Sequence, residues 1–311
     1  MSVPVFTMMV GLPGSGKSTL AEKIAKKDNN TIVLSSDALR EELCGNIDDQ
    51  TKNRDVFEVM NERTIDNLKA GKSVVYDATN VHSKGRVSLL KKIKDSGAEC
   101  TKVCRIVPEK YGICIKRNAE RERHVPNEII NRMRCSFETP YYFEGWDRIE
   151  GTTEWDHVHN ICISTWMVIA DEFEQDNPHH DKTLGGHSFE VVKILKNRGI
   201  EDEDLLNAAL LHDIGKLFTR KHLNRKGEGT KEAHYYGHEN VGAYEILFTN
   251  VDNPLYVSLL VNLHMRPMNF KNEETINKYK SYWGEKIFSD VMTLYEADRE
   301  AHAYDKSRRG L

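Results

Sequence analysis

The sequence lacks a long apolar run, a strong charge of one sign and a paired cysteine pattern, and each absence argues against a class of protein. No run approaches the ~20 apolar residues that a membrane span needs, and no basic, apolar leader opens the chain. We therefore expect a cytoplasmic protein without membrane contact. The formal net charge of −4 gives no general attraction to nucleic acid, so such a partner would need a local basic groove. The six cysteines have no paired spacing and are interpreted as reduced thiols.

The hydrophobic pattern changes near the middle of the 311 residues. In the first half, short apolar runs alternate with helical segments, which predicts an α/β domain with a parallel sheet and helices on both faces. The runs are residues 5–10, 31–36, 73–79 and 100–107. From about Asp156 onward, apolar residues recur at helical spacing, for example in EDEDLLNAALLHDIGKLF (201–218), which predicts an all-α domain. We place the two domains at residues 1–152 and 153–311.

Residues 11–19 read GLPGSGKST, which satisfies G-x-x-x-x-G-K-[ST] and stands after a strand and before a helix. The glycines let backbone N–H groups converge on phosphate oxygens, and the helix N-terminus adds a favourable dipole. We expect Lys17 to reach the β- and γ-phosphates of ATP and Ser18 to hold Mg²⁺. The expected ATP site consists of Gly14, Ser15, Gly16, Lys17, Ser18 and Thr19.

The ends of the next two strands suggest where an acceptor would bind. In an open α/β sheet, ligands bind beyond the carboxyl ends of the strands, which places Asp37 in SSDALR beside the phosphates. A carboxylate there can accept a proton from an attacking hydroxyl, and Arg40 could bind an acceptor phosphate. The alternative is that Asp37 only caps the next helix. Asp77 in YDATN could assist Mg²⁺, orient an arginine or be a turn residue.

These motifs, together with CIKRNAERERHVPNEIINRM and FEGWDRI, resemble the kinase domain of phage-type polynucleotide 5′-kinases over about residues 5–148. The resemblance implies that Lys17 and Ser18 are the P-loop lysine and hydroxyl, and that Asp37 is the general base for the 5′-OH. It implies that Arg40 faces the acceptor phosphate and that Asp77 positions this arginine.

The arginine-rich stretch KRNAERERHVP (116–126) follows the fourth strand, where a lid belongs. Arginine supplies fixed charge to transferring phosphoryl oxygens. The resemblance implies that Arg117 and Arg121 contact ATP from the lid, with Arg121 catalytic. Because the stretch is about one residue shorter than the family pattern, Arg123 is a rival for Arg121.

Histidines and aspartates recur in a fixed order, H…HD…H…H…D, on helix-like segments of the second half. The set is His187, His212, Asp213, His238, His264 and Asp298. Imidazole and carboxylate ligands together suit Mn, Fe, Co, Ni or Zn, and water bound to such an ion becomes a nucleophile at neutral pH. The alternative is that His212 and Asp213 form a structural pair in the core.

This order resembles the HD-domain phosphohydrolase superfamily over about residues 157–305. The resemblance implies an all-α, metal-dependent phosphoesterase. Its first metal site would be His187, His212, Asp213 and Asp298. A second ion would use His238 and His264 with Asp213 bridging, and the resemblance places Lys216 near the substrate phosphate.

A kinase for 5′-OH ends and a phosphoesterase for 2′,3′-cyclic or terminal phosphates would repair both ends of one break. We therefore expect an RNA (or DNA) end-repair enzyme that hands its product to a separate ligase, by analogy with enzymes that join these domain types. The alternatives are a small-molecule nucleoside or nucleotide kinase fused to a nucleotide phosphohydrolase, and a nucleotide-gated regulator without catalysis.

Overall fold

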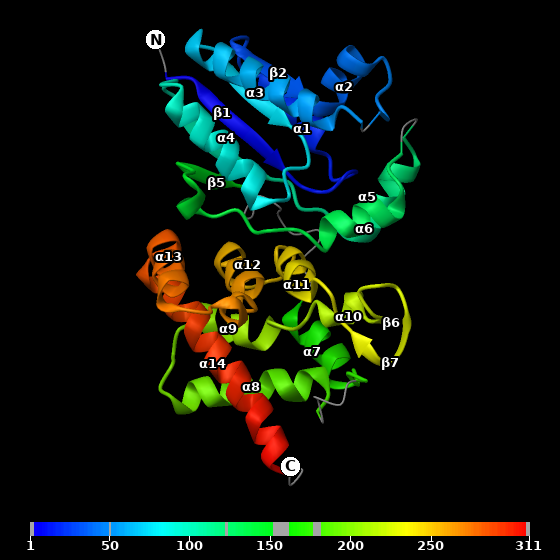
Figure 1. The fold of residues 1–311 in the computed structure, drawn as a ribbon, viewed down its shortest axis with the longest axis vertical. Coiled ribbons are helices and arrows are strands. Elements are labelled where there is room, and N and C mark those ends of the chain that lie inside the picture. Colours follow the sequence, from blue (N-terminus) through cyan, green and yellow to red (C-terminus); the bar gives the residue numbers. More distant parts are fainter. Residues whose placement is uncertain (1–2, 50, 122–123, 152–161, 177–181, 309–311) are drawn as a thin grey trace. The chain divides into compact units, whose positions relative to one another are not determined.

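The chain folds into two compact units, which are described separately below (Figure 1). The computed structural model describes residues 3–49, 51–121, 124–151, 162–176 and 182–308. The first unit comprises Met1–Met133 and Pro140–Asp156, and the second comprises Arg134–Thr139 and His157–Leu311. The expected boundary at 152/153 lies outside the described residues.

The first unit is built on a parallel sheet of five strands in the order β2-β3-β1-β4-β5. The strands are β1 (Val5–Val10), β2 (Thr31–Ser35), β3 (Ser73–Asp77), β4 (Thr101–Ile106) and β5 (Arg148–Glu150). The central strand β1 is almost continuously apolar, because helices cover a parallel sheet on both sides. Phe6, Met8, Met9 and Val10 of β1 are all buried. The sequence prediction of a parallel sheet with flanking helices is confirmed.

The helices of the first unit return the chain between parallel strands. They are α1 (Lys17–Ala25), α2 (Ser36–Cys44), α3 (Asn53–Lys69), α4 (Ser83–Asp95), α5 (Tyr111–Ala119) and α6 (Asn127–Arg134), with a 3₁₀ turn η1 (Tyr142–Glu144). Because all strands run the same way, the residues that follow β1, β2 and β3 meet at one edge of the sheet. This edge therefore collects the P-loop, Asp37 and Asp77.

A buried ion pair holds α4 against η1. Arg86 donates through Nε and Nη2 to the two carboxylate oxygens of Glu144, at 2.9 and 2.6 Å. Its Nη1 also donates to the carbonyl of Asn80, and Trp146 Nε1 donates to Glu144. Both charged side chains are at most 1% exposed, so the pair depends on complete hydrogen bonding for its stability.

The second unit is helical, with one short hairpin that the sequence did not predict. Its helices are α7 (Ile163–Asp171), α8 (Leu184–Asn197), α9 (Glu203–Leu211), α10 (Lys216–Thr219), α11 (His238–Ile246), α12 (Pro254–Leu263), η2 (Arg266–Asn269), α13 (Glu273–Trp283) and α14 (Glu285–Arg308). The hairpin pairs β6 (Lys221–Leu223) with β7 (Gly229–His234) in antiparallel register. The all-α prediction missed it because these strands are polar and mostly exposed, without alternating apolar residues. Every described helix is too short or too polar to cross a membrane.

Residues 134–139 belong to the second unit although they lie before the last strand of the first. Phe137 is fully buried and packs edge-on against Tyr244, with ring centroids 5.2 Å apart. Thr139 Oγ1 lies 2.8 Å from Ser258 Oγ, and Asn262 Nδ2 donates to the carbonyl of Phe137. A boundary drawn at a single point in the sequence cannot describe this segment.

Candidate active sites

The P-loop between β1 and α1 needs glycine at two positions. Gly14 and Gly16 have φ of +81° and +95°, a region that side chains disfavour. A Cβ on Gly14 would also lie 2.3 Å from the carbonyl oxygen of Cys114. Ser15 Oγ is buried and has no hydrogen-bond partner among the residues that the structure describes, which suits a loop that surrounds an anion.

Lys17 and Asp77 are buried together at the edge of the sheet. Lys17 Nζ donates to the carbonyl of Leu12 at 2.7 Å. Burial lowers the pKa of Lys17 to about 8, against the opposing attraction of Asp77. Burial raises the pKa of Asp77, which a hydrogen bond from Ser18 and the charge of Lys17 oppose. Asp77 therefore stands next to the hydroxyl expected to hold Mg²⁺, which favours a metal-assisting role among the roles left open.

Asp37 lies in the first turn of α2 but does not cap it. The N-cap is Ser35, whose Oγ accepts from the backbone N–H of Ala38 at 3.5 Å, so the capping alternative is wrong. The Asp37 side chain is 37% exposed, and its Oδ1 accepts from Arg40 Nη1 at 3.0 Å. A carboxylate that is both held and accessible can receive a proton from an incoming hydroxyl.

Arg40 is buried, at 4% exposed, and its guanidinium joins two helices. Nη1 donates to Asp37 and Nη2 donates to Asn53 Oδ1 at 2.9 Å. The carboxylate that Arg40 contacts here is Asp37, one helical turn away on the same helix, and the positioning by Asp77 that the resemblance implied stays a prediction. The acceptor-phosphate contact of Arg40 stays a prediction. No pattern in the sequence singled out Asn53.

The arginines of the expected lid differ in their surroundings. Arg117 Nη1 donates to Glu109 Oε2 at 2.8 Å, and this carboxylate is 2% exposed. The positive charge of Arg121 contributes to lowering the pKa of both Lys17 and Asp77. Its rival Arg123 lies outside the described residues.

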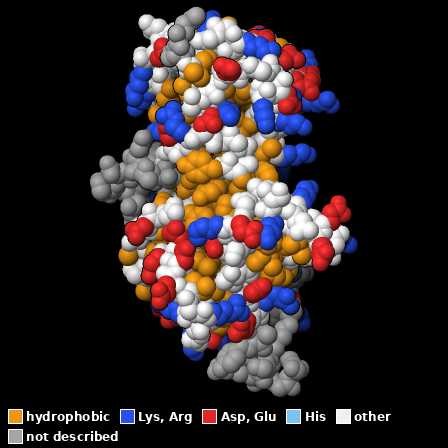
Figure 2. All heavy atoms as spheres, turned by 90° about the vertical axis from the view of Figure 1, so that its left-hand side faces the viewer, with side chains coloured by type: hydrophobic (Ala, Val, Ile, Leu, Met, Phe, Trp, Pro, Cys, Tyr) orange, Lys and Arg blue, Asp and Glu red, His pale blue; other side chains and the backbone are white. Residues whose placement is uncertain are grey.

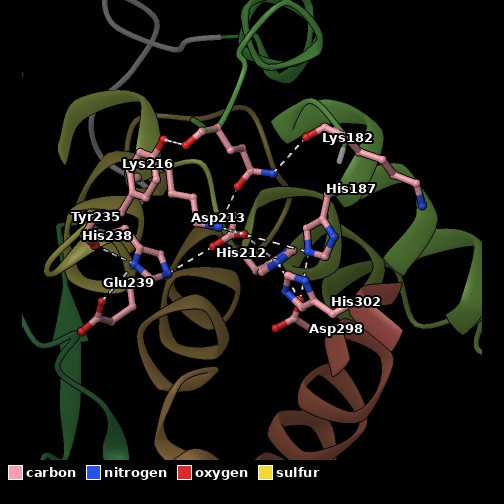
Figure 3. A network of polar contacts seen from close by, with 12 residues as sticks. Lys182, His187, His212, Asp213, Lys216, Tyr235, His238, Glu239, Asp298 and His302 are labelled. Atoms are coloured by element: carbon pink, nitrogen blue, oxygen red, sulfur yellow. Dashed lines mark hydrogen bonds and ion pairs between the residues drawn. The ribbon is translucent and has the colours of Figure 1, made fainter. Parts of the chain in front are cut away.

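Six expected metal ligands of the second unit converge on one buried centre, and Figure 3 shows all of them except His264. Two ligand sets, each with donor atoms within 4.8 Å of one another, share Asp213. One is His187, His212 and Asp213, and the other is Asp213, His238 and His264. Asp298 Oδ1 accepts from His187 Nε2 at 2.9 Å and lies 3.6 Å from His212 Nε2. Asp213 thus belongs to both candidate ligand sets, and its bridging of two ions stays a prediction.

Three histidines of this centre are held in the tautomer that a metal requires. Nδ1 of His212, His238 and His264 lies 2.6–2.9 Å from the backbone carbonyl three residues earlier. A carbonyl only accepts, so each Nδ1 donates, and in the neutral ring the lone pair is on Nε2. All three Nε2 atoms are buried and face the centre, and those of His212 and His238 lie 3.3 and 3.1 Å from the Asp213 carboxylate. Inward lone pairs beside two carboxylates fit a divalent ion, which is strong evidence against a purely structural role for His212 and Asp213.

His302 is a further candidate ligand that the sequence reading missed. It lies one turn after Asp298 on α14, with Nε2 3.4 Å from Asp298 Oδ1. Its ring centroid is 4.6 Å from that of His187, and the three residues form a third possible ligand set. The Asp-x-x-x-His spacing in DREAH was the signal, because residues four apart share one face of a helix.

Charge compensation keeps both carboxylates ionised in this buried setting. Burial would raise the pKa of Asp213, but Lys216 and His212 hold it well below its usual range. Burial would also raise the pKa of Asp298, but hydrogen bonds from His187 and His212 outweigh this effect and hold the pKa well below its usual range. Burial would lower the pKa of His212, but Asp213 outweighs it and raises the pKa to about 10.

A break in the helix brings His212 and Asp213 to the same centre. The pattern over 201–218 predicts one helix, but α9 ends at Leu211 and α10 begins at Lys216. Gly215 in this break allows α11 to approach, since a Cβ there would lie 2.0 Å from the carbonyl oxygen of His238. The turn therefore aims adjacent side chains at one point and seats His238 opposite them.

Lys216 extends from this turn over the centre. Its Nζ lies 2.7 Å from Asp213 Oδ2 and donates to Gln175 Oε1 at 2.9 Å. It also lies 5.6 Å from the centroid of the Tyr235 ring, while the Tyr235 hydroxyl donates to the backbone carbonyl of Gln175. An ammonium held beside a metal centre is placed to contact a phosphate oxygen.

Comparison with known proteins identifies both units. Residues 6–140 match the AAA domain family, and residues 184–302 match the HD domain family. The chain joins a P-loop kinase domain to an HD domain. P-loop kinase domains use ATP with Mg²⁺, and HD domains bind divalent metal ions.

A curated relative is similar to part of the chain. L-seryl-tRNA(Sec) kinase of Methanococcus maripaludis is 28% identical over 144 residues, which are 45% of this chain and 55% of that protein. The chain thus spans about half the length of this relative.

Solved structures resemble parts of the chain. One from the Pnkp1/Rnl/Hen1 RNA repair complex is 17% identical, with 64% of this chain and 69% of that chain covered and a TM-score of 0.39. A gluconokinase from Sinorhizobium meliloti is 20% identical, with 48% of this chain and 82% of that chain covered and a TM-score of 0.34.

Proposed function

We propose that this enzyme repairs nucleic-acid ends, with RNA as substrate: the kinase domain phosphorylates 5′-OH ends, and the HD domain hydrolyses 2′,3′-cyclic or terminal 2′/3′ phosphates. The observation that carries the proposal is the joining of two phosphate chemistries in one chain. One site holds Asp37 next to a P-loop, and the other holds inward histidine lone pairs around Asp213. The curated relative is named as a kinase of an aminoacyl-tRNA, and this supports an acceptor hydroxyl carried by RNA.

In the kinase domain, Asp37 accepts the proton of the 5′-hydroxyl as its oxygen attacks the γ-phosphorus of ATP. The bond from γ-phosphorus to the bridging oxygen breaks, and ADP leaves. Lys17 and Arg121 stabilise the charge that develops on the phosphoryl oxygens. Arg40 keeps the Asp37 carboxylate in place through the 3.0 Å contact.

In the HD domain, the residues around Asp213 would hold one or two divalent ions of the Mn, Fe, Co, Ni or Zn type. When bound, these ions supply an acidified water and neutralise phosphate charge. Lys216 binds a non-bridging phosphate oxygen and orients the phosphoester above the centre. Gln175 keeps the ammonium there when the lysine releases Asp213.

The experiment uses a short RNA with a 5′-OH and a 2′,3′-cyclic phosphate, incubated with ATP and Mg²⁺ and, in parallel, with Mn²⁺, Ni²⁺ or Co²⁺. Lys17→Ala should lower 5′ phosphorylation by at least about 10²-fold and preserve cyclic-phosphate opening. Asp213→Ala should abolish cyclic-phosphate opening, preserve 5′ phosphorylation and reduce the amount of bound metal. Lys23→Ala and Asp252→Ala, at exposed positions, serve as matched controls.

Two outcomes would refute the proposal. If either substitution abolishes both activities while the fold persists, the two sites are not independent. If the RNA ends stay unchanged while free nucleotides are turned over, the enzyme belongs to nucleotide metabolism instead.

A further inference from the structure

A basic hairpin projects next to the metal centre of the HD domain, in a chain that is acidic overall. Residues 220–234 read RKHLNRKGEGTKEAH, with five Lys or Arg and two Glu. Most of these side chains are exposed, including Lys221, Arg225, Lys226 and Lys231. By contrast, Figure 2 shows Lys and Arg mixed with Asp and Glu on the face it presents. The hairpin is therefore a local source of positive charge, as binding of a polyanion by an acidic protein requires.

The end of the hairpin carries a stack of planar side chains. His234 and Tyr236 are stacked, with centroids 5.4 Å apart and planes at 7°. The guanidinium of Arg225 lies 5.3 Å from the centroid of the Tyr236 ring, and Tyr236 is 36% exposed. Aromatic rings and guanidinium planes are the surfaces on which unpaired bases stack. Positive charge and a stacking surface together distinguish single-stranded nucleic acid from other anions.

A chain of contacts fixes this surface relative to the metal centre. The backbone N–H of Ala233 donates to the carbonyl of Asp176, and Tyr235 donates to the carbonyl of Gln175. Gln175 in turn accepts from Lys216, and the next residue after Tyr236–Gly237 is the metal-ligand candidate His238. If a terminal phosphate contacts Lys216, the nucleotides that adjoin this phosphate would lie over the hairpin.

We propose that β6, β7 and Tyr236 form the binding surface for the unpaired nucleotides that precede the phosphate hydrolysed in the HD domain. This inference rests on the proposed function and specifies its substrate as a single-stranded oligonucleotide rather than a free nucleotide. Tyr236 stacks a base, with Arg225 and His234 extending the stack. Arg225, Lys226 and Lys231 contact the backbone phosphates.

The test measures binding by the full chain in EDTA without ATP, so that no turnover occurs. The probe is an RNA of about 12 nucleotides with a fluorescein-blocked 5′ end and a 3′ phosphate, followed by anisotropy. Tyr236→Ala should weaken binding about 5- to 100-fold, the range for loss of one base–aromatic stack. Tyr282→Ala, an equally exposed tyrosine on α13 at 40%, should leave binding unchanged.

A triple Arg225/Lys226/Lys231→Ala variant should reduce the slope of log affinity against log salt by about 2. The matched control changes three exposed lysines of the same domain, Lys271, Lys278 and Lys280. Hydrolysis of a 2′,3′-cyclic mononucleotide and 5′ phosphorylation should keep their kcat/KM in Tyr236→Ala, because neither reaction uses the hairpin.

Failure of this inference differs from failure of the proposed function. If the wild-type enzyme opens the cyclic phosphate of an RNA, but Tyr236→Ala and the triple variant bind and process it normally, the hairpin is not the binding surface. Equal kcat/KM for oligonucleotide and mononucleotide would overturn it as well. Absence of any end processing by the wild type would instead refute the proposed function.

Discussion

Replacing Gly215 by alanine probes how the HD centre is assembled. The added methyl would lie 2.0 Å from the carbonyl oxygen of His238 and 2.7 Å from the backbone nitrogen of Gly242. Both atoms are backbone of α11, so no side chain can rotate away. Ordinary contact begins near 3.4 Å, so α11 must move by about 1.4 Å. We expect a loss of about 1–3 kcal/mol in the free energy of unfolding, the usual effect of overpacking.

The same movement would carry His238 Nε2 away from Asp213 Oδ1, which is now 3.1 Å distant. Metal stoichiometry, measured after equilibration with Mn²⁺ and desalting, should therefore fall for the ion that uses His238, while 5′ phosphorylation by the kinase domain persists. Urea-induced unfolding of the HD domain checks the stability change. Gly229→Ala is the matched control, because nothing lies within 4 Å of a Cβ there. A Gly215→Ala protein with wild-type metal content and unfolding midpoint would refute the packing argument.

Three further predictions concern other parts of the chain. The kcat/KM for ATP should fall as pH rises through about 8, because the buried Lys17 ammonium loses its proton there; a profile flat well above that pH would contradict this. Arg86→Met should lower the free energy of unfolding of the kinase domain by about 3–5 kcal/mol in urea titrations, because a buried carboxylate loses its partner. Arg54→Met, in an exposed pair, should leave it nearly unchanged. His302→Ala should weaken Mn²⁺ binding about 10- to 100-fold by calorimetry, with exposed His222→Ala as control; equal affinities would exclude His302 from the centre.

The kinase domain was largely predictable because its signals are local. The P-loop spacing, the apolar runs and the glycine and proline positions each act within a few residues, so the four expected strands appear nearly where they were predicted. The partner of Arg40 was not predictable, because which carboxylate it meets depends on how α2 starts. Ser35 takes the cap, and this leaves Asp37 one turn before Arg40.

In the HD domain, too, one part of the site was predictable from the sequence and another part was not. The sequence by itself determined the ligand types and their order, because imidazole and carboxylate chemistry is a property of the residues. Only the tertiary structure decided that α9 breaks after Leu211 and that His302 approaches His187. It also decided that a polar hairpin stands next to the centre. These features depend on contacts between segments far apart in the chain, which no local periodicity records.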